Sequence, residues 1–202
     1  MTLEIIDCEQ RSPEWYEARR GIPTASMFQI IMTGGDGRQT YLRKLAGERI
    51  TGELQESFTN EHMERGRTME AEARAWYKMM FPARNVQQVG FIKRTICGGS
   101  PDALVDDNRI LEIKTALPHI LIPMLEAQQK NPDYFPPKHK AQCQGNLFVA
   151  GRTICDIIVY WPKMPVLHCT QHLDGSYVAD MQSAVQYFDL ELRKLVTKLK
   201  GM

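Results

Sequence analysis

The chain has 202 residues, of which 43% are hydrophobic and 24% are charged. This composition excludes wholesale disorder, a collagen-like repeat and a coiled coil. The 25 basic residues nearly balance the 24 acidic residues, so the net charge of +1 argues against a protein that coats nucleic acid through its overall charge. The same charge remains compatible with an enzyme that gathers its positive side chains in one groove.

We expect a single domain over residues 1–202, because no Pro/Gly/Ser-rich or single-sign stretch suggests a linker. The five cysteines are odd in number and form no C-x-x-C pair, which argues against a disulfide scaffold. The first twenty residues lack the basic and apolar parts of a signal peptide, and no apolar run has the length of a membrane-spanning helix. The sequence therefore predicts a cytoplasmic protein without a membrane segment.

The first 80 residues are predicted to be helical. Ser12 and Pro13 favour the start of one helix, and Gly21 favours its end. A second helix is expected to begin with Thr24 as its cap and to end at Gly34–Gly35, and a third to cover 39–50. The longest helical pattern, 60–80, places one apolar stripe toward the core. That stripe consists of Met63, Met69, Ala73, Trp76 and Met80.

The remaining chain is predicted to form a mixed sheet with flanking helices. Short apolar runs at 86–93, 97–105 and 110–115 indicate three antiparallel strands. Helical patterns follow at 118–131 and 137–150, strand patterns at 154–161 and 166–172, and an amphipathic helix at 177–199. This order predicts an α/β fold with a central mixed β-sheet, in which a helical part, 1–80, precedes the core sheet of 81–202.

The segment GGSPDALVDDNRILEIKTA carries the strongest chemical signal. Residues two apart on a strand share a face, so Glu112 and Lys114 point together, and a hairpin that turns near Asp107 brings Asp102 beside them. Two carboxylates there are suitable oxygen ligands for Mg²⁺, with the backbone carbonyl of Ile113 as a third. Lys114 can orient a metal-bound water or assist its deprotonation. These are the parts of a metal-dependent nuclease.

The same pattern has a purely structural interpretation. A carboxylate near the end of a hairpin is usually solvated, and an E-x-K pair on a strand is usually a weak surface ion pair. His168, Cys169 and His172 lie close in sequence, but no second pair has the spacing of zinc ligands, so we do not expect a zinc site.

Pro101, Asp102, Glu112 and Lys114 resemble the PD-(D/E)xK nuclease motif. Four further stretches between residues 15 and 149 resemble, in order, the lambda-exonuclease or YqaJ-type viral recombinase family. They are WYEARRGIPTAS, RGRTMEAEAR, GGSPD and KAQCQGNL. The resemblance implies the restriction-endonuclease-like fold of PD-(D/E)xK nucleases. Residues 117–140 match no part of the family pattern, and we assign them no role.

The family places a 5′-phosphate site near the first of these stretches. By position, Arg19 and Ser26 resemble the arginine and serine that hold the phosphate, with Arg20 as a competitor of Arg19. A planar guanidinium and the free N–H groups of a helix start both suit phosphate. Ser100 resembles a motif serine that contacts DNA. Without the resemblance, Arg19 is simply a solvated helix charge.

The resemblance also extends the metal centre. Glu70 resembles the glutamate of the family's G-x-x-x-E helix, which supplies a further carboxylate to the metal. Gln142 resembles the glutamine that supports the metal-bound water and the substrate phosphate. From the residues alone, both belong to solvated helix faces. Met63 lies seven residues before Glu70, where a strand-separating wedge is conceivable, but its helical spacing favours a core position.

The resemblance implies a Mg²⁺-dependent 5′-to-3′ exonuclease, for which Mn²⁺ substitutes. Such an enzyme degrades one strand of linear double-stranded DNA that has a 5′-phosphorylated end, and leaves a 3′ single strand for recombination by strand annealing. It further implies a homotrimer and a single-strand annealing protein as partner. Two alternatives stay open: a PD-(D/E)xK endonuclease with the same metal site, and a non-catalytic nucleic-acid-binding module.

Overall fold

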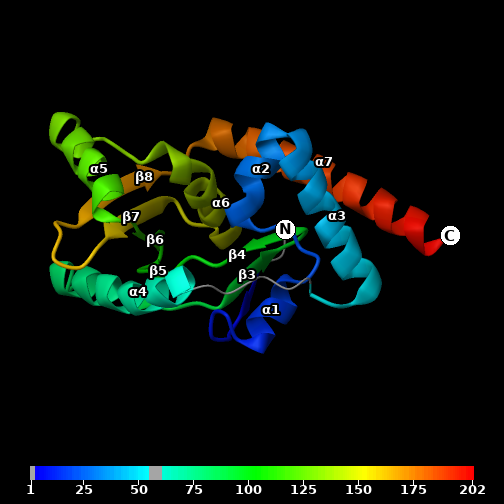
Figure 1. The fold of residues 1–202 in the computed structure, drawn as a ribbon, viewed down its shortest axis with the longest axis horizontal. Helices are drawn as coiled ribbons and strands as arrows, with labels where there is room; N and C mark the ends of the chain where they lie inside the picture. The colour runs from blue at the N-terminus through cyan, green and yellow to red at the C-terminus, as the bar shows by residue number, and fades with distance from the viewer. Residues whose placement is uncertain (1–2, 55–60) are drawn as a thin grey trace.

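The computed structural model describes residues 3–54 and 61–202, which build two β-sheets with helices around them (Figure 1). The smaller sheet has the antiparallel order β1 (Leu3–Ile6), β3 (Phe91–Arg94), β4 (Cys97–Gly99). The larger sheet has the order β2-β5-β6-β7-β8, in which β6 and β7 are parallel and the other neighbours antiparallel. Its strands are β2 (Val86–Gln87), β5 (Ala103–Val105), β6 (Arg109–Thr115), β7 (Ile154–Tyr160) and β8 (Leu167–His172).

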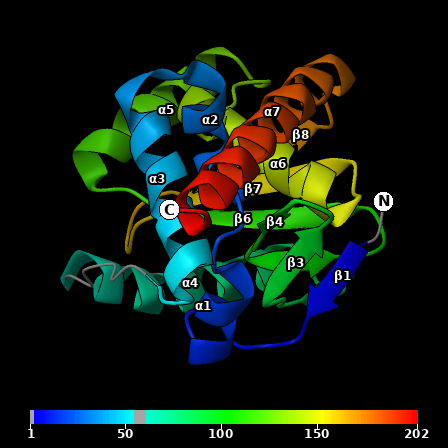
Figure 2. The ribbon, with the colours of Figure 1, turned by 90° about the vertical axis from the view of Figure 1, so that its right-hand side faces the viewer.

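Helices cover both faces of the larger sheet. Helix α4 packs on one face and α6 on the other, while α2, α3 and α7 form a layer beyond α6 (Figures 1 and 2). Helix α1 lies beside β3. The helices are α1 (Pro13–Arg19), α2 (Phe28–Thr33), α3 (Gly35–Thr51), α4 (Glu61–Met80), α5 (Pro118–Lys130), α6 (Lys140–Ala150) and α7 (Gly175–Lys200), with 3₁₀ helices η1 (Ala25–Met27) and η2 (Pro137–His139). Within the described ranges, no helix has the length and apolar character needed to cross a membrane.

The larger sheet confirms the predicted mixed α/β architecture, and its two faces build two hydrophobic clusters. On the α4 face, Ala73 and Tyr77 pack against Leu111, Ile113 and Ile158. On the α6 face, residues of β6 and β7 join the main core with α2, α3, α6 and α7. Because successive strand residues point to opposite faces, Glu112 and Lys114 lie on the α6 face and Asp156 on the α4 face.

Several predictions for the first 80 residues need correction. The segment is not wholly helical, because β1 pairs with β3, about ninety residues away. The helix expected from Thr24 begins as η1, and the Thr24 side chain makes no capping hydrogen bond. The prediction that Ser12 caps α1 is confirmed, since its side chain accepts a hydrogen bond from the Trp15 N–H.

The stripe of α4 is also partly different. Met69 and Ala73 are buried as expected, but Met80 is 52% exposed and Tyr77 is fully buried in its place. Tyr77 follows Ala73 by one helical turn and packs with it against the sheet, whereas Met80 is the last residue of the helix. The side chain of Met63 lies outside the described residues, so its expected core position stays a prediction.

Two expected strands divide between the two sheets. The run 86–93 contains β2 in the larger sheet and β3 in the smaller, and the run 97–105 contains β4 in the smaller and β5 in the larger. Gly90 lies in the first break, between β2 and β3. The chain passes so close to the Cys8 carbonyl oxygen there that a Cβ would lie 2.4 Å from it. Ser100, Pro101 and Asp102 make the second break. Asp102 therefore lies in a bend just before β5, not on a strand as expected.

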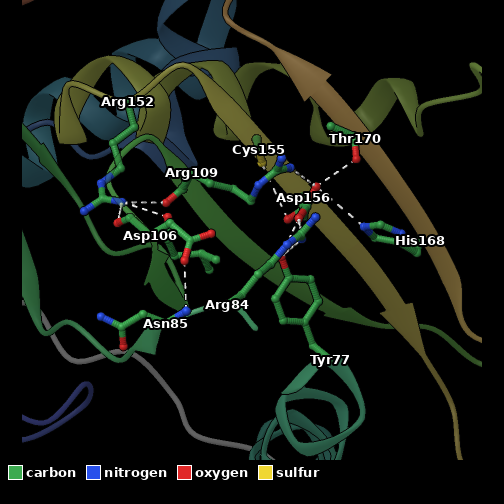
Figure 3. Close-up of polar contacts among 11 residues, drawn as sticks. Tyr77, Arg84, Asn85, Asp106, Arg109, Arg152, Cys155, Asp156, His168 and Thr170 are labelled. Carbon is green, nitrogen blue, oxygen red and sulfur yellow. Dashed lines mark hydrogen bonds and ion pairs between the residues drawn. The ribbon is translucent and has the colours of Figure 1, made fainter. Parts of the chain in front are cut away.

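A network of charged and polar side chains surrounds Asp156 on the α4 face of the larger sheet (Figure 3). Asp156 is fully buried on β7, and Arg84 and Arg109 form ion pairs with its two oxygens at 2.5 and 2.6 Å. Tyr77 and Thr170 donate hydrogen bonds to the same carboxylate. Burial alone raises the pKa of a carboxyl, but here the His168 imidazole 3.5 Å away, the hydrogen bonds from Tyr77 and Thr170, and the charge of Arg109 outweigh burial and hold the pKa of Asp156 well below its usual value.

We expect Asp156→Asn to lower the free energy of unfolding by about 3–5 kcal/mol, because it leaves two partly buried arginines without a counter-charge. The native pKa lies below the unfolded value, so this stabilisation is present above about pH 4 and is lost as the pH falls. Urea unfolding at several pH values measures both effects. Thr170→Val, which removes one hydrogen bond to the carboxylate, is the control and should cost about 1–3 kcal/mol. A variant as stable as wild type contradicts the assignment.

Candidate functional site

The bend between β4 and β5 opens onto a cavity of about 170 Å³ where the two sheets meet. Helix α6, helix α4, η1 and the segment around α1 complete its wall. Its lining includes Glu70, Asp102, Ile113, Lys114 and Gln142 from the predicted metal centre. The same cavity is lined by Arg19, Ser26 and Ser100, which were predicted to bind the 5′-phosphate. Glu112 is not part of this lining, but it contacts Lys114 and Gln142, which are.

Glu112 is buried on β6, with 1% of its surface exposed, and each of its carboxylate oxygens has a donor. Lys114 Nζ and Gln142 Nε2 lie 3.2 and 3.1 Å from Oε2. The Asn146 side-chain amide donates to Oε1. Gln142 and Asn146 are four residues apart, so one face of α6 presents both amides to the strand. Donors from β6 and from α6 therefore hold the Glu112 carboxylate in place.

Asp102 faces this group from the bend. Its Oδ2 accepts a 2.6 Å hydrogen bond from the Ile113 backbone N–H, and its own N–H donates to the Leu111 carbonyl at 3.0 Å. Burial, and then the charge of Glu112, raise the pKa of Asp102 to about 7. Asp102 in the bend and Glu112 on β6 are therefore close enough to repel each other, and the spacing of the motif predicted that they lie together.

Lys114 is the cation of this cluster. Burial lowers the pKa of an ammonium group, but the charges of Glu112 and Asp102 outweigh burial and raise the pKa of Lys114 above its usual value. The side chain is therefore protonated at neutral pH in this arrangement. Of the two functions expected from the sequence, orienting a water or an oxygen atom suits this ammonium better than accepting a proton.

The acidic cluster suits a divalent cation. A cation between Asp102 and Glu112 removes the repulsion that raises the pKa of Asp102. Mg²⁺ is usually held by one or two carboxylates and keeps several waters, each of which needs about 30 Å³, so the cavity has the space. In the described part of the chain, no three His, Cys, Asp or Glu side chains form a metal-binding group. Glu70 instead forms a 2.6 Å ion pair with Arg11.

Arg19 lines the other part of the cavity. Its guanidinium stacks 3.8 Å from the centre of the Trp15 ring, and burial lowers its pKa. Among the described residues, no hydrogen bond or ion pair involves this guanidinium. Arg20, its competitor, contacts Glu17 and the Gly52 carbonyl and does not line the cavity. The structure therefore favours Arg19 as the arginine available to an anion.

Two serines lie in the wall near Arg19. Ser26 is exposed in η1, where its hydroxyl lies 3.2 Å from the Thr24 hydroxyl. Ser100 accepts a 2.9 Å hydrogen bond from the Trp15 indole, so one tryptophan contacts both the arginine and the serine. An arginine, two hydroxyl groups and the first turn of η1 together form a surface that can hold a phosphate.

Sequence reasoning missed several side chains of the cavity, among them Gln10, Arg11 and Asn146. Asn146 had a detectable signal, because it follows Gln142 by one helical turn. Gln10 donates to the Val89 and Pro101 carbonyls at 2.8 and 3.0 Å, and so joins the loop before α1 to the bend that carries Asp102. No local sequence pattern predicts Gln10 or Arg11 as site residues, because their hydrogen bonds are made to residues 59 or more positions away.

The sequence model of the YqaJ-like viral recombinase domain matches residues 14–153. The chain belongs to this family. Its fold is similar to the crystal structure of an alkaline exonuclease, LHK-Exo, from Laribacter hongkongensis, with a TM-score of 0.84 and 30% identity over 94% of this chain and 96% of that one. The LHK-Exo complex with dAMP matches equally well.

A phage-related exonuclease from Haemophilus somnus 129PT shares the fold at a TM-score of 0.68 and 13% identity, covering 88% of this chain and 96% of that one. No curated protein matched in the sequence comparison. The family and the fold expected from the motifs, including the PD-(D/E)xK-like core, are thereby confirmed for the YqaJ-like chain.

We expect Asp102→Asn to stabilise the metal-free protein at pH 8 by on the order of 2 kcal/mol. The native pKa of Asp102 lies above the unfolded value, so wild-type stability falls as the pH rises from about 4 toward 7, and the neutral amide abolishes that fall. Urea unfolding at pH 5 and pH 8 with chelator measures the difference. Asp180→Asn, at an exposed position on α7, is the control. Equal pH dependence in wild type and Asp102→Asn contradicts the expectation.

Proposed function

We propose that this YqaJ-like protein is a Mg²⁺-dependent 5′-to-3′ exonuclease that degrades one strand of linear double-stranded DNA. The observation that carries the proposal is that one cavity joins the acidic cluster of Asp102, Glu112 and Lys114 to the unpaired Arg19 guanidinium. Membership of the family supports a nuclease. The similar LHK-Exo is an alkaline exonuclease whose structure has been determined with dAMP, a nucleoside monophosphate.

Asp102, Glu112 and the Ile113 carbonyl are the proposed metal ligands, with Glu70 as a further carboxylate. When bound, Mg²⁺ activates a water and stabilises charge on the phosphate; Mn²⁺ is expected to substitute. Protonated Lys114 orients the attacking water and balances the charge that develops on the phosphate. Gln142 holds Glu112 through its amide nitrogen and reaches the same cavity, where it can support the water.

The phosphate-binding wall explains why a DNA end is the proposed substrate. Arg19 presents a guanidinium whose donors have no acceptor among the described residues, beside Ser26 and Ser100. A terminal 5′-phosphate carries more charge than an internal phosphodiester and suits such a donor set. Binding of that phosphate places the next linkage toward the acidic cluster, because both groups of residues share one small cavity.

Incubation with three DNA substrates tests the proposal. Linear duplexes with a 5′-phosphate should lose one strand in the presence of Mg²⁺, duplexes with a 5′-hydroxyl should be degraded more slowly, and covalently closed circles should be spared. Release of nucleotides, with chelator as a blank, is the measurement. Cleavage of circles instead supports an endonuclease, and binding without cleavage supports the non-catalytic module.

Lys114→Ala should lower turnover about 10²-fold or more while DNA binding is retained, because the lost ammonium no longer orients the water or balances the charge of the reacting phosphate. Single-turnover rates and binding to the 5′-phosphorylated duplex measure the two effects. Lys138→Ala, which removes a lysine that does not line the cavity, is the matched control. Full turnover in Lys114→Ala refutes the role of this residue.

We further propose that three copies form a ring-shaped homotrimer and that a single-strand annealing protein receives the exposed 3′ strand. Light scattering at several concentrations should give about three times the 23.2 kDa of one chain. A concentration-independent monomer contradicts the trimer, whereas the exonuclease assay stands apart from that result.

A further inference from the structure

Arg11 combines a strained backbone with a side chain directed into the cavity. Its φ of 73° lies in the left-handed region, which a residue with a Cβ rarely adopts. It precedes the Ser12 cap of α1, and its neighbour Gln10 binds the Val89 and Pro101 carbonyls. The loop is thus fixed against the bend that carries Asp102. A glycine suits this backbone better, so the arginine is present at a conformational cost.

The guanidinium of Arg11 is anchored but far from saturated. Arg11 Nη2 lies 2.6 Å from Glu70 Oε1, which is its one acceptor among the described residues. A guanidinium has five N–H donors in a planar fork, so most of them remain available. The side chain is 31% exposed and lines the cavity. An arginine held at one nitrogen by a carboxylate presents its remaining donors in a fixed direction.

The position of Arg11 indicates which phosphate it can reach. Its anchor Glu70 and the nearby Asp102, whose charge acts on Arg11, belong to the acidic part of the cavity. Arg19 occupies the other part, stacked on Trp15. A DNA strand whose 5′-phosphate contacts Arg19 therefore brings its first internucleotide phosphate, not its terminal one, toward Arg11.

We propose that Arg11 is a catalytic residue that binds the phosphate at which the bond is broken, with Glu70 as its anchor. This inference rests on the proposed exonuclease function. It adds a second arginine to the cavity, with a function different from that of Arg19: Arg19 binds the end, and Arg11 binds the reacting linkage. A phosphodiester oxygen accepts from the free donors of the Arg11 guanidinium while Nη2 stays on Glu70.

The test compares Arg11→Gly with wild type on two 5′-phosphorylated duplexes. One has a natural first linkage, and the other has an uncharged methylphosphonate there. With chelator present to prevent cleavage, wild type should bind the natural duplex roughly tenfold or more tightly, as expected for one charge-assisted hydrogen bond. Arg11→Gly should bind both equally, and its slope of log affinity against log salt should be smaller by about 0.9. Arg11→Lys should recover part of the discrimination.

Two controls keep the result specific. Arg20→Ala removes the same charge outside the cavity and should discriminate between the linkages as wild type does. Arg11→Gly should stay folded and unfold close to the wild-type temperature, because relief of the backbone strain opposes the loss of the partly exposed ion pair with Glu70. It should keep the preference for a 5′-phosphate over a 5′-hydroxyl.

If Arg11→Gly still discriminates between the linkages, or if it loses the preference for the 5′-phosphate, the assignment of Arg11 is overturned while the exonuclease stands. If wild type neither prefers the 5′-phosphate nor degrades linear duplexes with Mg²⁺, the proposed function fails, and the inference fails with it.

Discussion

The burial of the Glu112 carboxylate is the constraint on which the site depends. A buried charge is tolerated only where donors replace the lost water, and here they come from Lys114 on the same strand and from Gln142 and Asn146 on α6. Helix α6 must therefore approach the strands closely. Gly99 permits this approach, since a Cβ at that position would lie 2.1 Å from Asn146 Oδ1.

The two faces of the larger sheet place carboxylates in opposite electrostatic surroundings. On the α4 face, Asp156 is matched by two arginines and several hydroxyl or imidazole partners, and its pKa is lowered. On the α6 side, Asp102 faces Glu112, and its pKa is raised to about 7. The first carboxylate is already satisfied and holds strands and α4 together. The second carries an unfavourable burial and repulsion that protonation, or a cation if one binds, would relieve, and this difference separates the structural network from the candidate site.

The order of elements was largely readable from the sequence, because periods of 3.6 and 2 follow directly from helix and strand geometry. The division of two strands between sheets was not, because it depends on contacts such as that of Gly90 with the Cys8 carbonyl, far away in the chain. Strand β1 was missed for the same reason, since its partner β3 lies about ninety residues later.

The residues of the candidate site were likewise predictable where local spacing places them and not where distant contacts do. Spacing alone brought Asp102, Glu112 and Lys114 together, and family motifs added the residues on α4, η1 and α6. Sequence could not choose between Arg19 and Arg20, which are adjacent at the end of α1 and differ only in what the fold places around them. The place of Arg11 in the site could not be predicted from the sequence, because its ion-pair partner, Glu70, is 59 positions away.

The half-buried Arg19 links recognition to the stability of the fold. A guanidinium partly removed from water without an acceptor carries a desolvation penalty, which stacking on Trp15 opposes. The benefit is rigidity, because the arginine needs little reordering when an anion arrives. If Arg19 binds the DNA end as proposed, substitutions selected only for thermal stability should accumulate at this position and weaken that binding, a conflict between stability and activity that is common in natural enzymes.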